Sequence, residues 1–578
     1  MKVLRVLLAA VLAVGLFAGC SGGTAPTEAT TAATTAAATE AVTEAATAAP
    51  ADQNLYVSYG GGTPLSIDPA LNSATNGSRV IQAAHVGLMG YQPEGDTAVI
   101  KPELAESYTM SDDGLVYTFT LREGLKWSDG SDFLASEVAF SWNRAASAEL
   151  GADYGFMFDV IEGYADGELN VVTDDAARTI TVTLNAPTPY FLSLCAFPTF
   201  YPVKEAVVDN EGIWATKPET YIGTGAFRMT QYSVDEIIRF EKNPNFWNAD
   251  EVKLETLNFR LSEDNVAILS SYETGDVSFI NAIDPTEFDR INQQYPGQLV
   301  FGDYIGTYYV LFNVHKDLSP SYKQLSVQEQ SQARFALGQM VNREELVTGV
   351  TKAGQVAATG FYPKGLMDGL NSDVRETPSY GSWYTATNTT SSVNAAYTED
   401  QVTAAQTLID LGYTYTGSLE SGDLKFEGFP TIDFAFNNSG ANALIIQYVQ
   451  ETWNRFGIPS TINTEAWATL QDKLGNGDAE AARMGWIADF NDCVNFLEIF
   501  ISASGNNYPR LGQDIGEYTR NSDVTADAGL GAYWGLDGDQ TWADGYDALV
   551  AQIKATTDPQ ERADLCAQAE KVLMGSGG

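Results

Sequence analysis

The stretch Arg483-Met484-Gly485-Trp486-Ile487-Ala488-Asp489-Phe490-Asn491-Asp492 decides the fold, because it closes a run of alternating elements. Alternating polar and apolar residues predict strands, and apolar residues at helical spacing predict helices. These patterns predict strands at 431–436, 458–464 and 482–487, with helices at 443–456 and 467–474 between them. This β-α-β-α-β order predicts a parallel sheet. Ligands of such sheets bind beyond the carboxyl ends of the strands, which is where Asp489 lies.

Asp489 follows the last predicted strand, and Trp486 lies within that strand. A carboxylate at this point can receive a cation, and a neighbouring indole can shield the pair from water. The same residues also fit a plain structural role, because a strand Trp is usually a core residue and an Asp after a strand usually forms a turn. The spacing alone leaves both interpretations open.

The composition of the chain excludes several classes of partner. With 578 residues the chain is too long for one hydrophobic core and has room for about three to four domains. Its net charge is -43, with 75 acidic and 32 basic residues. This charge argues against nucleic acid and against docking of the folded part on an anionic membrane. We attribute the acidity to solubility and assign it no steering role.

The first twenty residues predict a targeting segment. Lys2 and Arg5 precede an apolar run at 6–18 that is too short to span a bilayer. The run ends Leu16-Phe17-Ala18-Gly19-Cys20, which resembles the lipobox of bacterial lipoproteins, in which the cysteine becomes the lipid-modified first residue. An ordinary signal peptide is the alternative. Residues 21–53 are rich in Ala and Thr and lack aromatic residues, so they predict a tether that builds no core.

Cysteine and histidine are too scarce to define a metal site or a histidine-dependent catalytic site. Beyond Cys20 the chain has Cys195, Cys493 and Cys566, which are far apart and form no C-x-x-C pair. At most one internal disulfide is possible among these three cysteines, and the sequence leaves their pairing open, so we do not predict one. We also predict no metal and no cofactor. The chain also lacks an H-E-x-x-H motif and has too few histidines for a histidine-dependent nucleophile, so we predict no enzyme activity. A secreted hydrolase with paired carboxylates is the alternative, although no spacing singles out such a pair.

Seven motifs in a fixed order resemble those of one known family. They are Ser66-Ile67-Asp68-Pro69, LREGLKWSDG at 121–130 with SWNR at 141–144, GTGAF at 223–227, NPNFW at 243–247, YYVLFN at 308–313, ARFAL at 333–337 with NRE at 342–344, and the stretch 483–492. On these motifs, over about residues 55–575, the chain resembles the solute-binding proteins of bacterial ABC importers, of the oligopeptide and dipeptide type.

The resemblance implies an α/β fold with two lobes that close over a ligand, mixed sheets flanked by helices, and an extra inserted domain in one lobe. The expected segments are a signal peptide at 1–20, a tether at 21–53, lobe I at 54–95 and 220–305, the inserted domain at 96–219, lobe II at 306–534, and a return to lobe I at 535–578. Members of the family usually continue past the helix matching 558–573. If that segment is missing, we expect lower stability and exposed strand edges.

The resemblance also implies a binding site for an extended peptide. Asp489 matches the carboxylate that pairs with the peptide α-ammonium, and the backbones of Gly485 and Ile487 match groups that bind the peptide main chain like an added strand. Arg483 matches a position that can meet a peptide carboxylate. The remaining expected contacts are Trp467 and Trp486 in side-chain pockets, with Tyr154, Ser73, Ala74 and Thr75 from the other lobe.

These expectations describe a monomeric, extracytoplasmic receptor, anchored to the cell membrane through Cys20, that delivers peptides to an ABC permease and has no chemistry of its own. Two alternatives remain at this point. The same fold also carries oligosaccharides or metal complexes, although Asp489 favours a free amine over a sugar. A peptide sensor that reports to a signalling partner would have the same sequence features.

Overall fold

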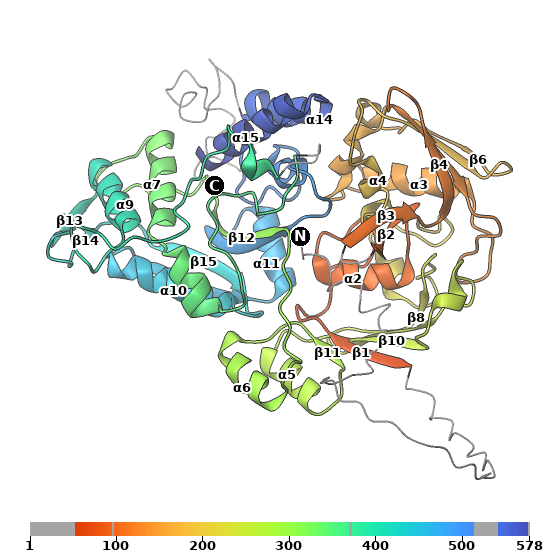
Figure 1. Ribbon diagram of the computed structural model, residues 1–578, viewed down its shortest axis with the longest axis horizontal. Coiled ribbons are helices and arrows are strands. Elements are labelled where there is room, and N and C mark those ends of the chain that lie inside the picture. The colour runs from red at the N-terminus through yellow and green to blue at the C-terminus, as the bar shows by residue number, and fades with distance from the viewer. Residues whose placement is uncertain (1–52, 95–96, 369–372, 514–541, 576–578) are drawn as a thin grey trace, which may run out of the picture.

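The computed structural model describes residues 53–94, 97–368, 373–513 and 542–575, and it contains two lobes side by side (Figure 1). The predicted signal peptide with Cys20 and residues 21–52 of the predicted tether lie outside the described residues. In the described part of the chain, no helix is long and apolar enough to cross a membrane. The fold is α/β, with mixed sheets flanked by helices, as the sequence predicts.

One lobe is built on a five-stranded sheet in the order β11-β1-β10-β9-β8. The first strand pairs in parallel with two strands from much later in the sequence, and the last three strands are antiparallel. The strands are β1 (Asn54–Ser58), β8 (Phe227–Ser233), β9 (Ile237–Lys242), β10 (Thr256–Arg260) and β11 (Phe279–Ile280). The accompanying helices are α2 (Thr75–Ala84), η5 (Ala249–Glu251), α5 (Asn265–Glu273), η6 (Pro285–Glu287) and α6 (Phe288–Gln294).

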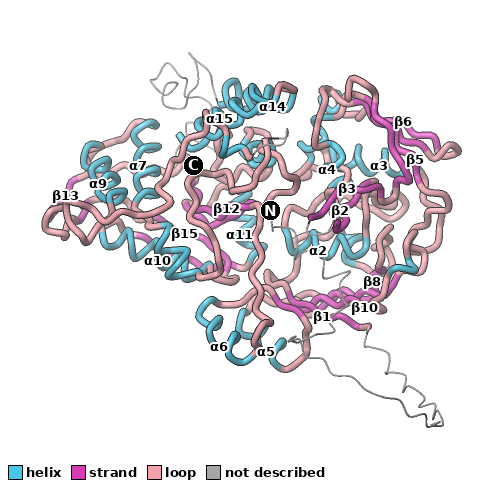
Figure 2. Tube along the Cα trace, in the orientation of Figure 1, coloured by secondary structure: helices cyan, strands magenta, loops and turns pink. Residues whose placement is uncertain are grey.

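The segment between α2 and β8 forms a subdomain of the same lobe, around an antiparallel sheet in the order β4-β5-β7-β6 and a hairpin of β2 and β3 (Figure 2). Tyr117, Phe119 and Leu121 alternate into its core, as their spacing predicts. The strands are β2 (Met89–Glu94), β3 (Thr97–Pro102), β4 (Ala105–Met110), β5 (Val116–Leu121), β6 (Val171–Asp174) and β7 (Thr179–Thr183). The helices are α3 (Ala135–Ala146), η1 (Gly155–Val160), η2 (Tyr164–Asp166), α4 (Phe191–Leu194), η3 (Pro198–Phe200) and η4 (Ile213–Thr216).

The second lobe contains the predicted β-α-β-α-β run. Its sheet has the order β12-β17-β15-β16, and β15 lies parallel to both β16 and β17, so the predicted parallel sheet is confirmed. β12 (Gly306–Phe312) adds to β17 in the antiparallel sense. The run consists of β15 (Ile432–Asn437), α10 (Asn442–Arg455), β16 (Ser460–Glu465), α11 (Trp467–Asn476) and β17 (Ala481–Ile487). Helix α10 ends before Gly457, whose positive φ of 79° lets the chain turn.

The second lobe contains further helices and one small two-stranded sheet around its central sheet. Helix α7 begins with a capping box between Ser326 and Glu329, and α9 begins with one between Thr398 and Gln401. The elements are α7 (Val327–Gln339), α8 (Arg343–Glu345), η7 (Leu346–Thr351), η8 (Val374–Glu376), α9 (Glu399–Asp410), β13 (Thr414–Thr416), β14 (Lys425–Glu427), α12 (Val494–Leu497), η9 (Glu498–Phe500), η12 (Ala543–Asp547), α14 (Ala548–Ala555) and α15 (Pro559–Gly575).

The described C-terminal helices pack on the second lobe. The Tyr362 hydroxyl donates to the Cys566 carbonyl at 2.8 Å, and the Glu570 carboxylate accepts from the backbone N–H groups of Phe361 and Tyr362. Helix α14 contacts α12, and α15 contacts η8 and α12. These contacts lie on the lobe that carries β17, whereas the resemblance leads us to expect a return of 535–578 to the first lobe.

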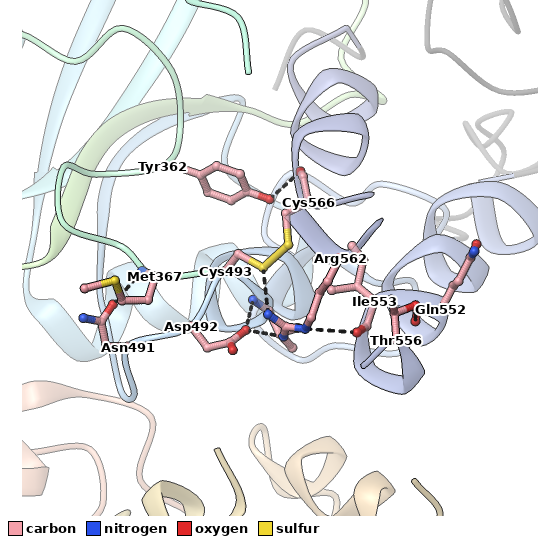
Figure 3. Close-up of a disulfide and its surroundings, with 11 residues drawn as sticks. Tyr362, Met367, Asn491, Asp492, Cys493, Gln552, Ile553, Thr556, Arg562 and Cys566 are labelled. Carbon is pink, nitrogen blue, oxygen red and sulfur yellow. Dashed lines mark hydrogen bonds and ion pairs between the residues drawn. A yellow bond between two sulfur atoms is a disulfide. The ribbon is translucent and has the colours of Figure 1, made fainter. Parts of the chain in front are cut away.

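A disulfide joins Cys493, just after the stretch that decides the fold, to Cys566 on α15 (Figure 3). The sequence leaves the pairing of the cysteines open, and the structure contains the one internal disulfide that their number allows. The two cysteines are 73 residues apart in sequence, and only the packing of α15 against the loop before α12 brings their Cα atoms to 6.4 Å. Cys195 is a free, buried thiol.

Candidate functional site

Strand β17 presents two different faces. Met484 and Trp486 are buried on one side, and Arg483, Gly485 and Ile487 are partly exposed. This alternation follows from the period of two in a strand. The strand therefore anchors itself in the core while it offers every second residue to the space between the lobes.

Strand β17 has a full-length partner on one side only. β12 pairs with it from Gly306 to Phe312. β15 pairs with Ala481 and Ala482 and then diverges. Beyond Ala482 the second edge of β17 has no strand partner among the residues that the structure describes. The end of β17 is therefore an open edge, on which an extended chain can form backbone hydrogen bonds.

Two hydrogen bonds define which backbone groups point to this open edge. The Ala488 N–H donates to the Ile305 carbonyl at 2.8 Å, and the Asn313 N–H donates to the Glu480 carbonyl at 2.9 Å, so even-numbered residues of β17 face β12. Backbone groups alternate sides along an antiparallel ladder. The N–H and C=O groups that point away from β12 are therefore those of Arg483, Gly485 and Ile487.

Gly485 leaves room for the ring of Tyr308, which a side chain at position 485 would displace. A Cβ atom there would lie 2.5 Å from the ring of Tyr308, its cross-strand partner on β12. The Arg483 guanidinium lies over the same ring, 4.5 Å from its centroid. Glycine at 485 therefore lets the Tyr308 ring cover the strand, and that ring in turn orients Arg483.

Asn495 holds Asp489 and Trp486 together. Its side-chain carbonyl accepts from the Asp489 backbone N–H at 2.9 Å and from the Trp486 indole N–H at 3.1 Å. Its amide nitrogen donates to the Asp489 carboxylate at 3.1 Å. The carboxylate and the indole are thus fixed next to each other at the end of β17.

Asp489 has neutral hydrogen-bond partners only. Burial, together with the negative charge of Glu498, raises the pKa of its carboxyl to about 7, and hydrogen bonds from Asn495 and Tyr154 limit the rise. No Lys or Arg of the described residues forms an ion pair with Asp489. A buried carboxylate with this environment is stabilised by any cation that enters beside it.

Tyr154 reaches Asp489 from the other lobe. Its hydroxyl hydrogen-bonds the carboxyl, and its ring lies 6.0 Å from the Trp486 ring. Burial raises the pKa of the Tyr154 hydroxyl well above its ordinary value. Tyr154 therefore stays protonated and donates to Asp489 across the cleft.

Arg483 is the cationic counterpart of Asp489 on the same strand. Burial lowers the pKa of its guanidinium to about 10, and no carboxylate of the described residues forms an ion pair with it. The site thus has an acidic group and a basic group, each lacking a charged partner, separated by the open edge of β17.

One cavity of about 1630 Å³ between the lobes brings the predicted site residues together. It extends from the site along β12 to Leu573 and Met574 on α15. Trp467, the first residue of α11, donates its backbone N–H to Glu263 of the other lobe at 3.2 Å. All ten predicted site residues line this cavity: Ser73, Ala74, Thr75, Tyr154, Trp467, Arg483, Gly485, Trp486, Ile487 and Asp489.

Sequence reasoning missed three residues that define the site. Asn495 has an available signal, because it is an amide six residues after Asp489, at the start of the helix that follows the loop. Tyr308 lies in a quoted motif, but the pairing register with Gly485 is visible only in the sheet. Glu498, which lies near Asp489, has no sequence signal that distinguishes it from the other acids.

The chain was compared with known protein families. Residues 99–508 match the family model described as bacterial extracellular solute-binding proteins, family 5 middle. The chain belongs to this family.

Curated relatives of this family 5 protein extend over most of its length. It is 28% identical to the oligopeptide-binding protein OppA of Bacillus subtilis, over 77% of each chain. It is 25% identical to the periplasmic oligopeptide-binding protein OppA of Escherichia coli, over 79% of each chain. Among solved structures, Haemophilus influenzae OppA in complex with RPPGFSPFR matches with a TM-score of 0.72 and 24% identity, covering 91% of this chain and 92% of that chain. The two-lobed fold is thus shared with known solute-binding proteins.

Proposed function

We propose that this family 5 protein captures extended peptides with a free α-ammonium group between its two lobes and delivers them to an ABC permease. Its family is one of solute-binding proteins, not of enzymes. The similar proteins whose names mention oligopeptides support the choice of a peptide as the ligand.

The single observation that carries the proposal is the open edge of β17 ending at Asp489. Backbone groups of Gly485 and Ile487 point to that edge, so they can pair with the main chain of any peptide. Main-chain pairing does not depend on the peptide sequence. The Asp489 carboxylate, which has no cationic partner in the described part of the chain, gives the bound chain a direction, because the α-ammonium is the cation that every peptide with a free amino terminus has at one end of its main chain.

The remaining predicted contacts complete the proposed site. Arg483 is available for a carboxylate of the peptide. Trp467 and Trp486 provide apolar walls for side chains, with Tyr154 and residues 73–75 from the opposite lobe. Ordered water in the cavity would let side chains of different sizes share these pockets.

We further propose that the protein acts outside the cytoplasm as a monomer anchored to the cell membrane through lipid on Cys20. The family description as extracellular supports the location. The lipobox-like sequence before Cys20 supports the anchor.

Native mass spectrometry of residues 54–578 tests the proposed function. The protein is purified, unfolded to release its ligands, refolded, and mixed with an equimolar set of peptides of two to nine residues. We expect many of these peptides to bind, and we expect Asp489→Ala to bind none of them at the same concentration. Loss of the ammonium pair should cost several kcal/mol.

N-acetylated copies of the same peptides are the matched control, because they keep the main chain and lose the charge. They should bind the native protein weakly. Binding of a sugar or metal complex instead of any peptide would contradict the proposal, as would equal binding of the free and acetylated peptides.

A further inference from the structure

The short helix η1 of the first lobe touches the second lobe at two places. At its start, Tyr154 hydrogen-bonds Asp489. At its end, the Asp159 carboxylate accepts two hydrogen bonds from the Lys554 ammonium of α14, at 3.0 and 2.9 Å. The ligand-binding loop and the C-terminal helices are therefore both in contact with one short segment of the opposite lobe, from Tyr154 to Asp159.

Lys554 also binds an acid of its own lobe. Its ammonium lies 3.1 Å from the Glu498 carboxylate on η9. The side chains of Glu498 and Lys554 are 2% and 13% exposed, and that of Asp159 is 32% exposed. Lys554 thus lies between a buried acid of the second lobe and a half-buried acid of the first.

Glu498 connects this ion cluster to the ligand site. It follows Asn495 by one turn, as α12 passes into η9. Asn495 holds the Asp489 carboxylate, and the charge of Glu498 acts on Asp489. The contacts form a closed ring that crosses between the lobes twice and runs through Asp489, Asn495, Glu498, Lys554, Asp159 and Tyr154.

A ring pair near this cluster also joins the lobes. Tyr190 of the first lobe stacks on Phe490, the residue after Asp489, with 4.7 Å between the ring centroids and 8° between the planes. Tyr190 is buried, which raises the pKa of its hydroxyl, and the charges of Lys554 and Glu498 are near enough to act on that pKa in opposite directions. The Lys554 side chain is largely buried and Asp159 is half-buried, so water screens this pair less than it screens a fully exposed ion pair.

We propose that Lys554 is a positioning residue that holds the lobes closed around the ligand by bridging Asp159 and Glu498, and that it thereby sets how long a ligand stays bound. This inference rests on the proposed function, because the ligand is the peptide that pairs with Asp489. Opening of the lobes separates Lys554 from Asp159 and leaves it paired with Glu498 alone. The bridge is therefore lost before the ligand leaves.

A second ion pair in the chain provides a matched control. Lys204 pairs with Asp129, and their side chains are 14% and 36% exposed, close to the values for Lys554 and Asp159. Both residues of this control pair belong to the first lobe. Its loss removes an ion pair of similar exposure without any effect on the contact between lobes.

The test is the rate of ligand dissociation, measured by stopped flow with a peptide whose fluorophore is on its last side chain. We expect Asp159→Asn and Lys554→Met to raise koff by about threefold to thirtyfold, with kon changed less than twofold. Lys204→Met should leave koff unchanged. Asp159→Asn keeps the Lys554–Glu498 pair, so it reports on the bridge even if Lys554→Met fails to fold.

An unchanged koff in Asp159→Asn would overturn the proposal, as would an equal rise of koff in Lys204→Met. If the native chain binds no peptide, the proposed function fails, and small-angle X-ray scattering then decides the bridge alone. A larger radius of gyration for ligand-free Asp159→Asn than for the native chain supports the bridge, and equal radii overturn it.

Discussion

Asp489 and Asp492 lie three residues apart in one loop, but their surroundings differ, because Asp492 is fully buried and Asp489 is partly exposed. Asp492 is paired with the Arg562 guanidinium at 2.7 Å, and both side chains are 1% exposed. Asp489 has only an amide and a phenol as partners. The first acid is neutralised within the chain and stabilises the fold. The second acid lacks a cation, and we infer that the ligand supplies it.

Replacing the cation beside Asp492 should give the largest effect. Arg562→Met leaves a buried carboxylate without its partner, so the free energy of unfolding should fall by about 3–5 kcal/mol. Thermal and urea unfolding followed by circular dichroism measure this change. Arg290→Met, which removes a cation from exposed pairs with Glu273 and Glu287, is the control and should leave the melting temperature nearly unchanged. Equal effects of the two variants would contradict the structural role of Arg562.

The disulfide next to Asp492 should have the second largest effect. Cys493→Ser combined with Cys566→Ser removes the covalent link between the loop and α15, and should lower the free energy of unfolding by about 2–4 kcal/mol. The melting temperature with and without reductant measures the same loss in the native protein. If the double variant and the native protein melt at the same temperature, the disulfide does not stabilise this end of the loop.

Removing the amide beside Asp489 should change binding more than stability. Asn495→Ala releases both the carboxylate and the Trp486 indole, so peptide affinity should fall about tenfold to a hundredfold. Isothermal titration calorimetry measures this loss. Asn491→Ala changes an amide of the same loop that accepts from the Met367 N–H instead, and it should keep most of the affinity. Similar losses of peptide affinity in both variants would contradict a specific role of Asn495 in orienting Asp489.

A change of one pH unit should have the smallest effect. Because the pKa of Asp489 is raised to about 7, its carboxyl is increasingly neutral below that pH. Peptide affinity should then fall by up to about tenfold for each pH unit below 7. The stability of the ligand-free protein should change in the opposite direction. Because the pKa of Asp489 is raised in the folded state, its contribution to the free energy of unfolding should increase as the pH falls from 7 toward the ordinary pKa of an aspartate. Titrations at pH 5 to 8 measure both trends, and Asp489→Asn should bind weakly and lose most of this dependence. An affinity that stays constant from pH 8 to 5 would contradict the unpaired state of Asp489.

The sequence predicts the part of the fold that depends on local pattern. Alternation at 431–436 and helical spacing at 443–456 are visible in the chain, and β15 and α10 lie there within about one residue. Asp489 is predictable as a residue beyond a strand end for the same reason. The divergence of β15 from β17 after Ala482, which opens the edge, depends on how the two strands pair and has no local signal.

The parts that the sequence did not predict depend on contacts between distant segments. Cys493 and Cys566 come together only because α15 crosses the loop before α12. The sequence does not distinguish Arg562 from the other Lys and Arg residues, which number 32 in total with it. Only the packing of α15 against the loop brings it next to Asp492. The family motifs give the order of the site residues along the chain. They do not show which acid forms an ion pair with a Lys or Arg of the same chain.

A double-mutant cycle with one octapeptide tests the comparison between the two acids. Calorimetry gives the affinities of the native protein and of Asp489→Asn for the free peptide and for its N-acetylated copy. We predict that acetylation weakens binding to the native protein by about a hundredfold or more and hardly affects Asp489→Asn, so that the coupling free energy is at least about 2 kcal/mol. Additive effects of the substitution and the acetylation would contradict the pairing of Asp489 with the α-ammonium group.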